Sequence, residues 1–286
     1  MPSRSNNVGL MCGFVLLAIG IRAQPLDAVE YLPGIAWPEP AVITPGENNA
    51  DAPSDAIVLF DGKDLSAWND DGSWQVENGV MIVGTTSLLT KRKFGDCQVH
   101  VEWSMPNPPR GNGQDRGNSG IFFMPHYEEA RQLYWKYEIQ ILDSYDNRTY
   151  FDGQAAAVYK QSPPLVNAMR RPGQWNTYDI VFIAPRFAED GTLNSPAYVT
   201  LVHNGVLVHN HYEMSGPTSW TAPPAYSKHA ERLPLGLQNH GHKVRFRNIW
   251  VREITPIVGE PASAPMLRKG NKRWPVGAKE PAGAGE

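Results

Sequence analysis

The sequence predicts an all-β protein, built as a sandwich of two antiparallel sheets. From residue 56 to residue 255, short segments alternate apolar and polar residues and are separated by turns rich in Gly, Asp and Asn. Residues 56–254 contain no βαβ rhythm and no amphipathic helix longer than a turn or two. Asn204-Gly205 joins two of the segments, and this dipeptide is the strongest short signal of a β-hairpin.

The first 23 residues are typical of an export signal. Arg4 precedes an apolar run from Val8 to Ile21, and Ala23 stands just before Gln24. This run of about 14 residues is shorter than the roughly 20 that a membrane span needs. We therefore expect a signal peptide over residues 1–23, a secreted or periplasmic bacterial protein, and no membrane span in the mature chain.

The remaining chain divides into three parts by composition. Residues 24–55 hold repeated Pro and few periodic apolar positions, which predicts an irregular lead-in. Residues 256–286 return to Pro, Ala, Gly and Lys, and we expect a flexible tail there. Between them lies the predicted sandwich domain, residues 56–255. Its strands are expected, in chain order, at 57–60, 74–84, 87–94, 97–103, 119–124, 134–142, 154–159, 177–183, 197–203, 206–211, 233–239 and 244–254.

Charge and composition limit the classes of function. The formal charge is −3, and the basic residues are scattered along the chain. No positive surplus exists to neutralise phosphates, so we expect no nucleic-acid partner. The nine Trp residues supply aromatic surface that can stack on sugar rings, although core packing is the simpler explanation for most of them.

The strand expected at 134–142 is the leading candidate for chemistry. Its apolar residues point to one face, whereas Glu138 and Gln140 share the other, and Asp143 follows the strand's end. In a pocket, Glu138 can carry a proton and Gln140 can donate to a bound hydroxyl or carbonyl. The alternative is the solvent-facing polar side of a one-sided sheet.

The neighbouring segment 115–124 adds an amide and a guanidinium. Asn118 and Gly120 lie on one face of the expected strand, and Gly117 with Gly120 leaves room for a ligand above the sheet. Arg116 at a pocket rim can neutralise an oxyanion or clamp a carboxylate. A turn with a bulge explains the glycines equally well, and a surface salt bridge is the alternative for Arg116.

A histidine and a second amide lie near the carboxyl end of the domain. Alternation in 233–254 places Gln238 and His240 on the polar side, where His240 can act as acid, base or metal ligand. A turn at 239–242 is the alternative. His209 and His211 share a strand face, but no third metal ligand is assignable. Oxygen ligands for a calcium-like divalent cation are offered loosely by Asp143, Asp146 or Asp152.

The long loop 144–171 follows the candidate strand directly. Long loops on a sandwich often carry recognition, and this one holds Tyr145, Tyr150, Phe151 and Tyr159. These rings offer stacking and hydroxyl contacts to a saccharide. Trp175 can complete such a platform, or it can pack the start of its strand in the core.

The chain resembles the 3-keto-disaccharide hydrolase family. The resemblance rests on eight segments in order, LFDGKDLSAW (59–68), NGVMIVG (78–84), LLTKRKFGDCQVHVEW (88–103), RGNSGIFF (116–123), YEIQILDS (137–144), GQWNTYDIVF (173–182), HNGVLVHN (203–210) and LQNHGHKVRFRNI (237–249). It implies a concanavalin A-like jelly roll with a carbohydrate-binding face. The paired carboxylates of laminarinase-type enzymes are absent, because Glu138 is followed by Gln140 and Leu142.

The resemblance implies cleavage of a 3-keto-glycoside by proton abstraction at C2, elimination and hydration. Under this hypothesis Glu138 and His240 serve as base and acid in an unresolved order. The enediolate is held by Arg116, Gln140 and Gln238, or by a bound cation. The expected substrate-binding residues are Asn118, Gln140, Asp143, Tyr159, Trp175 and Gln238. A non-catalytic carbohydrate-binding module is the main alternative, and a structural role at the cell surface is the third.

Overall fold

The computed structural model describes residues 28–128 and 133–282, which divide into two compact units. The larger unit spans residues 41–256, and the smaller combines 28–40 with 257–282. The signal peptide expected at 1–23 lies outside the described residues. Within those residues, no helix is long and apolar enough to cross a membrane.

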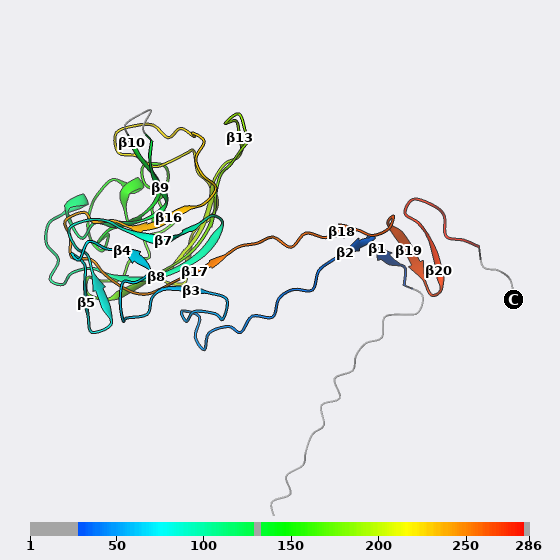
Figure 1. The fold of residues 1–286 in the computed structure, drawn as a ribbon, viewed down its shortest axis with the longest axis horizontal. Helices are drawn as coiled ribbons and strands as arrows, with labels where there is room; N and C mark the ends of the chain where they lie inside the picture. Colours follow the sequence, from blue (N-terminus) through cyan, green and yellow to red (C-terminus); the bar gives the residue numbers. More distant parts are fainter. Residues whose placement is uncertain (1–27, 129–132, 283–286) are drawn as a thin grey trace, which may run out of the picture. The chain divides into compact units, whose positions relative to one another are not determined.

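The larger unit confirms the predicted jelly-roll sandwich of two antiparallel sheets (Figure 1). Its five-stranded sheet has the order β10 (Leu133–Ile141), β9 (Ser119–Glu128), β16 (Leu233–Leu237), β7 (Leu88–Phe94) and β4 (Trp68–Asn69). The eight-stranded sheet has the order β15 (Val206–Glu213), β14 (Tyr198–His203), β11 (Trp175–Ile183), β8 (Cys97–Ser104), β17 (Arg245–Glu253), β6 (Val80–Ile82) and β5 (Gln75–Glu77), with β3 (Ile57–Phe60) paired to β17. A small sheet pairs β12 (Arg186–Phe187) with β13 (Leu193–Ser195).

The core lies between the two sheets because each strand turns its alternate apolar residues inward. Phe123 of β9 stacks on Phe182 of β11, with ring centroids 4.4 Å apart. The hydroxyl group of Tyr178 in β11 crosses the core and donates to the Gln140 carbonyl in β10 at 2.9 Å. This hydrogen bond fixes the height of β10, the strand predicted to carry chemistry, above the larger sheet.

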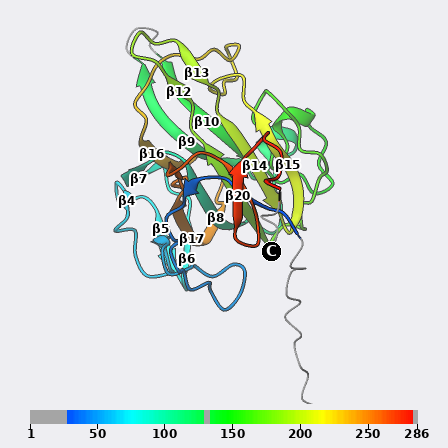
Figure 2. The ribbon, with the colours of Figure 1, turned by 90° about the vertical axis from the view of Figure 1, so that its right-hand side faces the viewer.

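Two local predictions have opposite outcomes. The Asn204-Gly205 hairpin is confirmed, because both residues have positive φ (53° and 80°) between paired strands β14 and β15. The strand expected at 154–159 is wrong, because Ala156 has φ of 69° and interrupts extended backbone. Residues 156–159 instead follow the free edge of β10, where Ala156 N–H donates to the Gln140 carbonyl at 2.9 Å. β10 and β9 lie side by side in the views of Figures 1 and 2.

The smaller unit consists of short strands from both flanks of the sandwich domain. β1 (Glu30–Leu32), β19 (Met266–Lys269) and β20 (Lys272–Pro275) form one sheet, and β2 (Ile35–Ala36) pairs with β18 (Glu260–Pro261). These strands differ from the flexible tail and irregular lead-in that composition predicts. Gly270, with φ of 58°, turns the chain between β19 and β20, and Trp274 is buried.

The last residues of the lead-in, 50–55, are hydrogen-bonded to the outer face of the eight-stranded sheet. The Ala50 carbonyl accepts hydrogen bonds from the side chains of Asn248 and Trp250, both at 2.9 Å. Arg252 donates to both oxygens of Asp55 at 2.8 Å. Residues 50–55 therefore belong to the packed structure of the larger unit.

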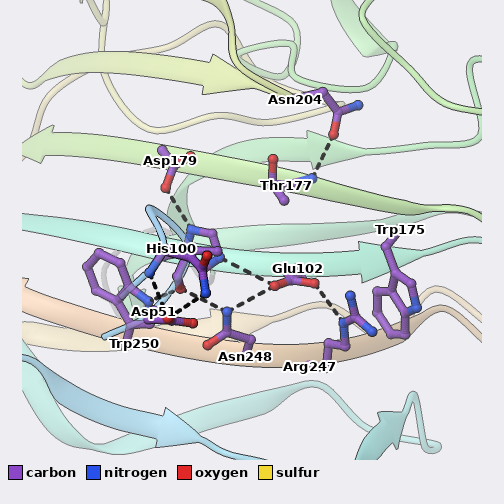
Figure 3. Close-up of polar contacts among 12 residues, drawn as sticks. Asp51, His100, Glu102, Trp175, Thr177, Asp179, Asn204, Arg247, Asn248 and Trp250 are labelled. Carbon is purple, nitrogen blue, oxygen red and sulfur yellow. Dashed lines mark hydrogen bonds and ion pairs between the residues drawn. The ribbon is translucent and has the colours of Figure 1, made fainter. Parts of the chain in front are cut away.

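A buried ionic network lies beside this lead-in, and Figure 3 shows His100 between Asp179 and Glu102. His100 donates through Nδ1 to Asp179 at 2.7 Å, and its Nε2 lies 3.8 Å from Glu102. Glu102 also accepts from Arg247 at 2.6 Å and from Asn248 at 2.9 Å. Strands β8, β11 and β17 are thus joined by charge on the face that does not contact the core.

Partners in this network outweigh the effect of burial on both titrating groups. Burial disfavours the imidazolium, but Asp179 and Glu102 raise the pKa of His100 to about 9. Burial also disfavours the carboxylate of Glu102, yet its ion pair with His100 and its hydrogen bonds from Asn248 and Arg247 lower its pKa to about 2. Both groups are therefore charged at neutral pH.

The network makes a contribution to stability that depends on pH. Because the pKa of His100 is raised from 6.5 to about 9, its contribution is complete below pH 6.5 and is lost as the pH rises towards 9. Because the pKa of Glu102 is lowered from 4.5 to about 2, its contribution is complete above pH 4.5 and is lost as the pH falls towards 2. The network stabilises most between pH 4.5 and 6.5.

Replacing the imidazole tests this dependence. We expect the stability advantage of the wild type over His100→Asn to shrink by up to about 3 kcal/mol between pH 6.5 and 9, because only the wild type loses an ion there. Urea unfolding at both pH values measures the advantage. His211→Asn, at an exposed position of β15, is the control. An advantage that is equal at both pH values would show that the charge of His100 does not stabilise the fold.

Candidate functional site

A cavity of about 370 Å³ lies over the outer face of the five-stranded sheet. Its volume is within the range of ligand pockets. Six of the nine sequence-predicted site residues line it, namely Asn118, Glu138, Gln140, Tyr159, Gln238 and His240, together with Gln114, Lys136, Tyr150 and Trp220. The acid and the imidazole singled out from the sequence therefore face the same cavity.

The floor of the cavity is formed by β9 and β10. Gly120 lies opposite Gln140 in the register, and Phe122 lies opposite Glu138. A Cβ atom on Gly120 would stand 2.7 Å from Glu138 Oε1 and 3.3 Å from Gln238 Oε1. Glycine at position 120 thus gives the Glu138 carboxyl group its place above the backbone, in the room that the sequence analysis assigned to a ligand.

Glu138 is a buried carboxyl group with an unusual pKa. Only 3% of the residue is exposed. Burial raises its pKa from 4.5 to about 7, although the charge of Lys136 opposes the rise. Lys136 Nζ lies 3.8 Å from Glu138 Oε2. Glu138 can therefore take up or release a proton near neutral pH, which is the property that general acid–base catalysis requires.

The side chain of Gln140 contacts Glu138 directly, and its backbone carbonyl accepts the hydrogen bond from Tyr178. When its amide nitrogen faces Glu138, it donates to Oε1 at 3.0 Å and to the Ser119 carbonyl at 3.2 Å. In the reverse orientation the nitrogen reaches Gln114 Oε1 at 3.2 Å. The first orientation suits an ionised Glu138 and the second lets a protonated Glu138 donate to the amide oxygen, so the amide can serve both charge states.

Gln238 and His240 enter from the segment that follows β16. Gln238 Oε1 is buried and has no hydrogen-bond partner among the described residues. It is an acceptor available to a ligand hydroxyl group. His240 is exposed at the cavity, and its ring lies parallel to that of His242 with centroids 6.1 Å apart. His242 Nε2 in turn lies 3.4 Å from Asp115 Oδ1.

An aromatic rim covers one side of the cavity. The hydroxyl groups of Tyr150 and Tyr159 are 2.9 Å apart. Burial and this hydrogen bond raise the pKa of Tyr159 above its ordinary value, so its hydroxyl group stays neutral. The ring of Trp220 lies 5.7 Å from that of Tyr150, centroid to centroid. Hydroxyl groups and aromatic faces are typical of sites that bind sugars.

Three lining residues were not predicted from the sequence. Lys136 precedes Glu138 by two positions in β10, so the two-residue period that links Glu138 and Gln140 also points to Lys136. Gln114 belongs to a one-turn helix, η1 (Gly113–Asp115), and Trp220 belongs to a loop, so neither lies in a periodic pattern. No sequence signal used above identifies these two residues.

Arg116 and Asp143 do not line this cavity. Arg116 Nε donates to Asp143 Oδ2 at 2.8 Å, and its NH2 group donates to the Tyr145 carbonyl at 2.9 Å. Asp143 is 1% exposed, so the pair is a buried ion pair beside a separate hollow of about 380 Å³. The salt bridge that the sequence analysis gave as the alternative for Arg116 is present, but its carboxylate is buried and not on the surface, and the guanidinium also donates to two carbonyls.

Trp175 also lies away from the cavity. It shares with Thr177 and Asp179 the outer face of β11, whereas Asn176 and Tyr178 point into the sandwich. The guanidinium of Arg247 lies over its ring, 4.2 Å from the centroid. The expectation of a sugar platform at Trp175 is wrong in placement, and so is the core alternative.

The cation expected from the sequence has no assembled ligand set. In the described part of the chain, no group of three or more His, Cys, Asp or Glu is arranged to hold a metal ion. Asp152 pairs with Lys160 at 3.1 Å, and Asp143 pairs with Arg116. His209 is buried and donates to the Ala156 carbonyl at 2.9 Å. A divalent cation therefore stays a prediction without a site.

Neutralising Glu138 tests its burial. The carboxylate is disfavoured in the fold, so the contribution of Glu138 to stability is highest below pH 4.5 and falls as the pH rises through about 7. We expect Glu138→Gln to gain up to about 3 kcal/mol in unfolding free energy, relative to the wild type, between pH 4.5 and 8.5. Denaturant unfolding at the two pH values measures this gain.

A matched control is Glu77→Gln, at an exposed position of β5. This variant should keep a constant difference from the wild type across the same pH range. If Glu138→Gln behaves in the same way, the carboxyl group at 138 titrates normally and the cavity does not desolvate it.

Comparison with known proteins places the chain. The family model for the 3-keto-alpha-glucoside-1,2-lyase-like domain matches residues 55–252. A crystal structure described as a "putative glycosyl hydrolase" from Parabacteroides distasonis ATCC 8503 is 46% identical, with a TM-score of 0.69 over 76% of this chain and 93% of that one. A second structure with the same description and organism is 20% identical, with a TM-score of 0.52 over 70% and 94%. The search of curated proteins found no match.

The family model matches most of this chain, and the alignment with the first crystal structure includes nearly the whole of that protein's chain. Together they support a carbohydrate-active, glycoside hydrolase-like function. The chain belongs to the 3-keto-disaccharide hydrolase family, whose model describes a 3-keto-alpha-glucoside-1,2-lyase-like domain.

Proposed function

We propose that this protein cleaves 3-keto-glycosides, including 3-keto-disaccharides, by proton abstraction at C2, elimination and hydration. The observation that carries the proposal is the buried carboxyl group of Glu138, whose pKa is raised to about 7 in a cavity that His240 also lines. A proton at C2 is acidic because it is next to the C3 carbonyl, so a base of this strength can remove it.

The first step forms an enediolate. Glu138 removes the C2 proton, and the electrons of the C–H bond move to the C3 oxygen. The ammonium group of Lys136, 3.8 Å from Glu138 Oε2, and the amide of Gln140 are the groups placed to stabilise this oxyanion. Lys136 takes the role that the sequence analysis gave to Arg116, because the guanidinium of Arg116 is paired with Asp143.

The second step expels the leaving group. The enediolate electrons re-form the C3 carbonyl, a C1–C2 double bond forms, and the C1–O bond breaks with its electron pair on the leaving oxygen. That oxygen needs a proton, and we assign its donor as His240, because this residue is exposed at the cavity mouth while Glu138 lies on the floor. Water then adds at C1 and gives a proton to His240, which lost its own to the leaving oxygen, and Glu138 returns a proton to C2. The sum is hydrolysis, with no oxidant or reductant.

Ordinary glycoside hydrolysis fits this cavity less well. It uses two carboxyl groups on either side of the scissile bond. Among the described residues that line the cavity, Glu138 is the single carboxyl group. The elimination route needs one carboxyl group and a second proton carrier, which is the set that these residues offer.

A non-catalytic carbohydrate-binding module is the second candidate. The aromatic rim of Tyr150, Tyr159 and Trp220 supports it, since such rings bind sugars without chemistry. A binder would retain an intact 3-keto-disaccharide, whereas the proposed enzyme releases 3-keto-glucose. The raised pKa of Glu138 favours the enzyme, because proton transfer near neutral pH requires a group with such a pKa, whereas hydrogen bonding to a sugar does not.

Substitution of the two proton carriers tests the assignment. We expect Glu138→Gln to lower kcat on a 3-keto-disaccharide by about 10²–10⁴-fold and His240→Ala by about 10²-fold, because each removes a proton transfer. Release of 3-keto-glucose measures turnover. Glu77→Gln and His211→Asn, at exposed positions that do not line the cavity, are the matched controls. Full turnover in both cavity variants would refute the proposal.

Lys136 is tested by a variant that keeps its length. We expect Lys136→Met to lower kcat by about 10²-fold, because the charge facing the enediolate is lost. The acid limb of the pH profile should also move to higher pH, since Lys136 lowers the pKa of Glu138. Lys63→Met, at an exposed turn, is the control. An unchanged pH profile would mean that Lys136 does not act on Glu138.

A further inference from the structure

Trp220 is an exposed aromatic residue on a loop that is firmly attached to β10. Trp220 is 65% exposed. Two positions earlier, the Thr218 hydroxyl donates to the Lys136 carbonyl at 3.0 Å and accepts from the Glu138 N–H at 3.1 Å. The side chain of Gln161 also donates to the Gly216 carbonyl at 2.7 Å. The indole is therefore held in position over the strand of Glu138 while its own surface stays open.

The indole is also ordered by its neighbours before any ligand binds. Lys160 Nζ lies 4.3 Å from the Tyr150 ring centroid and 5.5 Å from that of Trp220. The same ammonium group forms an ion pair with Asp152 at 3.1 Å. Asp152 thus neutralises the charge of Lys160. The aromatic wall, which consists of the rim residues Tyr150, Tyr159 and Trp220, therefore offers apolar faces without a free positive charge for an anionic ligand.

Two hollows meet at this wall. The cavity of Glu138 is one, and the other is a hollow of about 310 Å³ lined by residues 159–161 and by the loop segments 217 and 219–224. Tyr159 and Trp220 line both. The described lining of the second hollow has no carboxyl group and no histidine, so it provides contact surface next to the site of chemistry but no acid–base group of its own.

We propose that the second hollow binds the leaving-group half of a 3-keto-disaccharide, with Trp220 stacked on the apolar face of a neutral pyranose ring. This proposal rests on the function proposed above. One ring lies over Glu138 in the first cavity, and the next ring extends past Trp220 into the second hollow. The leaving group is therefore a neutral sugar rather than a small alcohol or an anionic sugar, because the wall is aromatic and its lysine is paired.

The test compares two substrates that differ only in the leaving group, a 3-keto-disaccharide and the matching methyl 3-keto-glucoside. The wild type should prefer the disaccharide in kcat/KM. In Trp220→Ala the ratio of the two kcat/KM values should fall about tenfold, since stacking contributes only to the disaccharide. Thr221→Tyr, which adds bulk at an exposed position of the second hollow, should lower the same ratio. Trp37→Ala, in the smaller unit, is the control for an exposed Trp.

Each outcome decides the proposal. A ratio that stays within twofold of the wild type in both Trp220→Ala and Thr221→Tyr would overturn it, even if both variants lose activity on the two substrates equally. If the wild type cleaves neither substrate, the function proposed above has failed instead. Calorimetric binding of the intact disaccharide and of 3-keto-glucose to Trp220→Ala then decides the subsite, since a selective loss of affinity for the disaccharide supports it and an equal loss contradicts it.

Discussion

Withdrawal of one carboxyl group from water is the constraint on which the site depends. Glu138 is buried on the floor of the cavity because the neighbouring strand β9 has Gly120 beside it, where a side chain would collide with Oε1. In water this carboxyl group would be ionised at neutral pH and would be a weak base. Burial raises the pKa of Glu138, and the positive charge of Lys136 opposes the rise. The balance of these effects sets a pKa near 7.

The outer face of the eight-stranded sheet has a network that stabilises the fold, and the outer face of the five-stranded sheet has the candidate site. On the outer face of the eight-stranded sheet, Glu102 has donors in His100, Arg247 and Asn248, and the lead-in covers part of the network (Figure 3). Each oxygen of the Glu102 carboxylate thus has a donor in this network. On the five-stranded sheet, Gln238 has a buried oxygen without a partner, and Glu138 has a charge that burial disfavours. Unsatisfied groups of this kind reduce stability and serve a ligand.

Much of the fold follows from local rules, and the site follows in part. Alternation predicts most strands, and Asn204-Gly205 predicts its hairpin because both residues tolerate positive φ. The same period places Glu138 and Gln140 on one face and, applied one step further, reaches Lys136. It also places Trp175 with Thr177 and Asp179, away from the core.

The remaining features depend on contacts between distant parts of the chain. Arg116 and Asp143 are 27 positions apart, and only the folded turn shows that each satisfies the other. Trp220 reaches the cavity because Thr218 attaches the loop of Trp220 to β10. Thr218 and its hydrogen-bond partner Glu138 are 80 positions apart in the chain. The apolar run at 154–159 has the composition of a strand, but Ala156 adopts positive φ to follow the edge of β10. No periodic pattern encodes such contacts.

Isotope exchange at C2 measures the proposed proton abstraction most directly. In heavy water, 3-keto-glucose released from a 3-keto-disaccharide should carry one deuteron at C2, above the exchange of 3-keto-glucose incubated without protein. Unreacted substrate should exchange the same position with wild type and not with Glu138→Gln. Product that keeps its original hydrogen at C2, from a substrate whose cleavage is not slowed when deuterium replaces that hydrogen, would contradict elimination and would indicate direct displacement at C1.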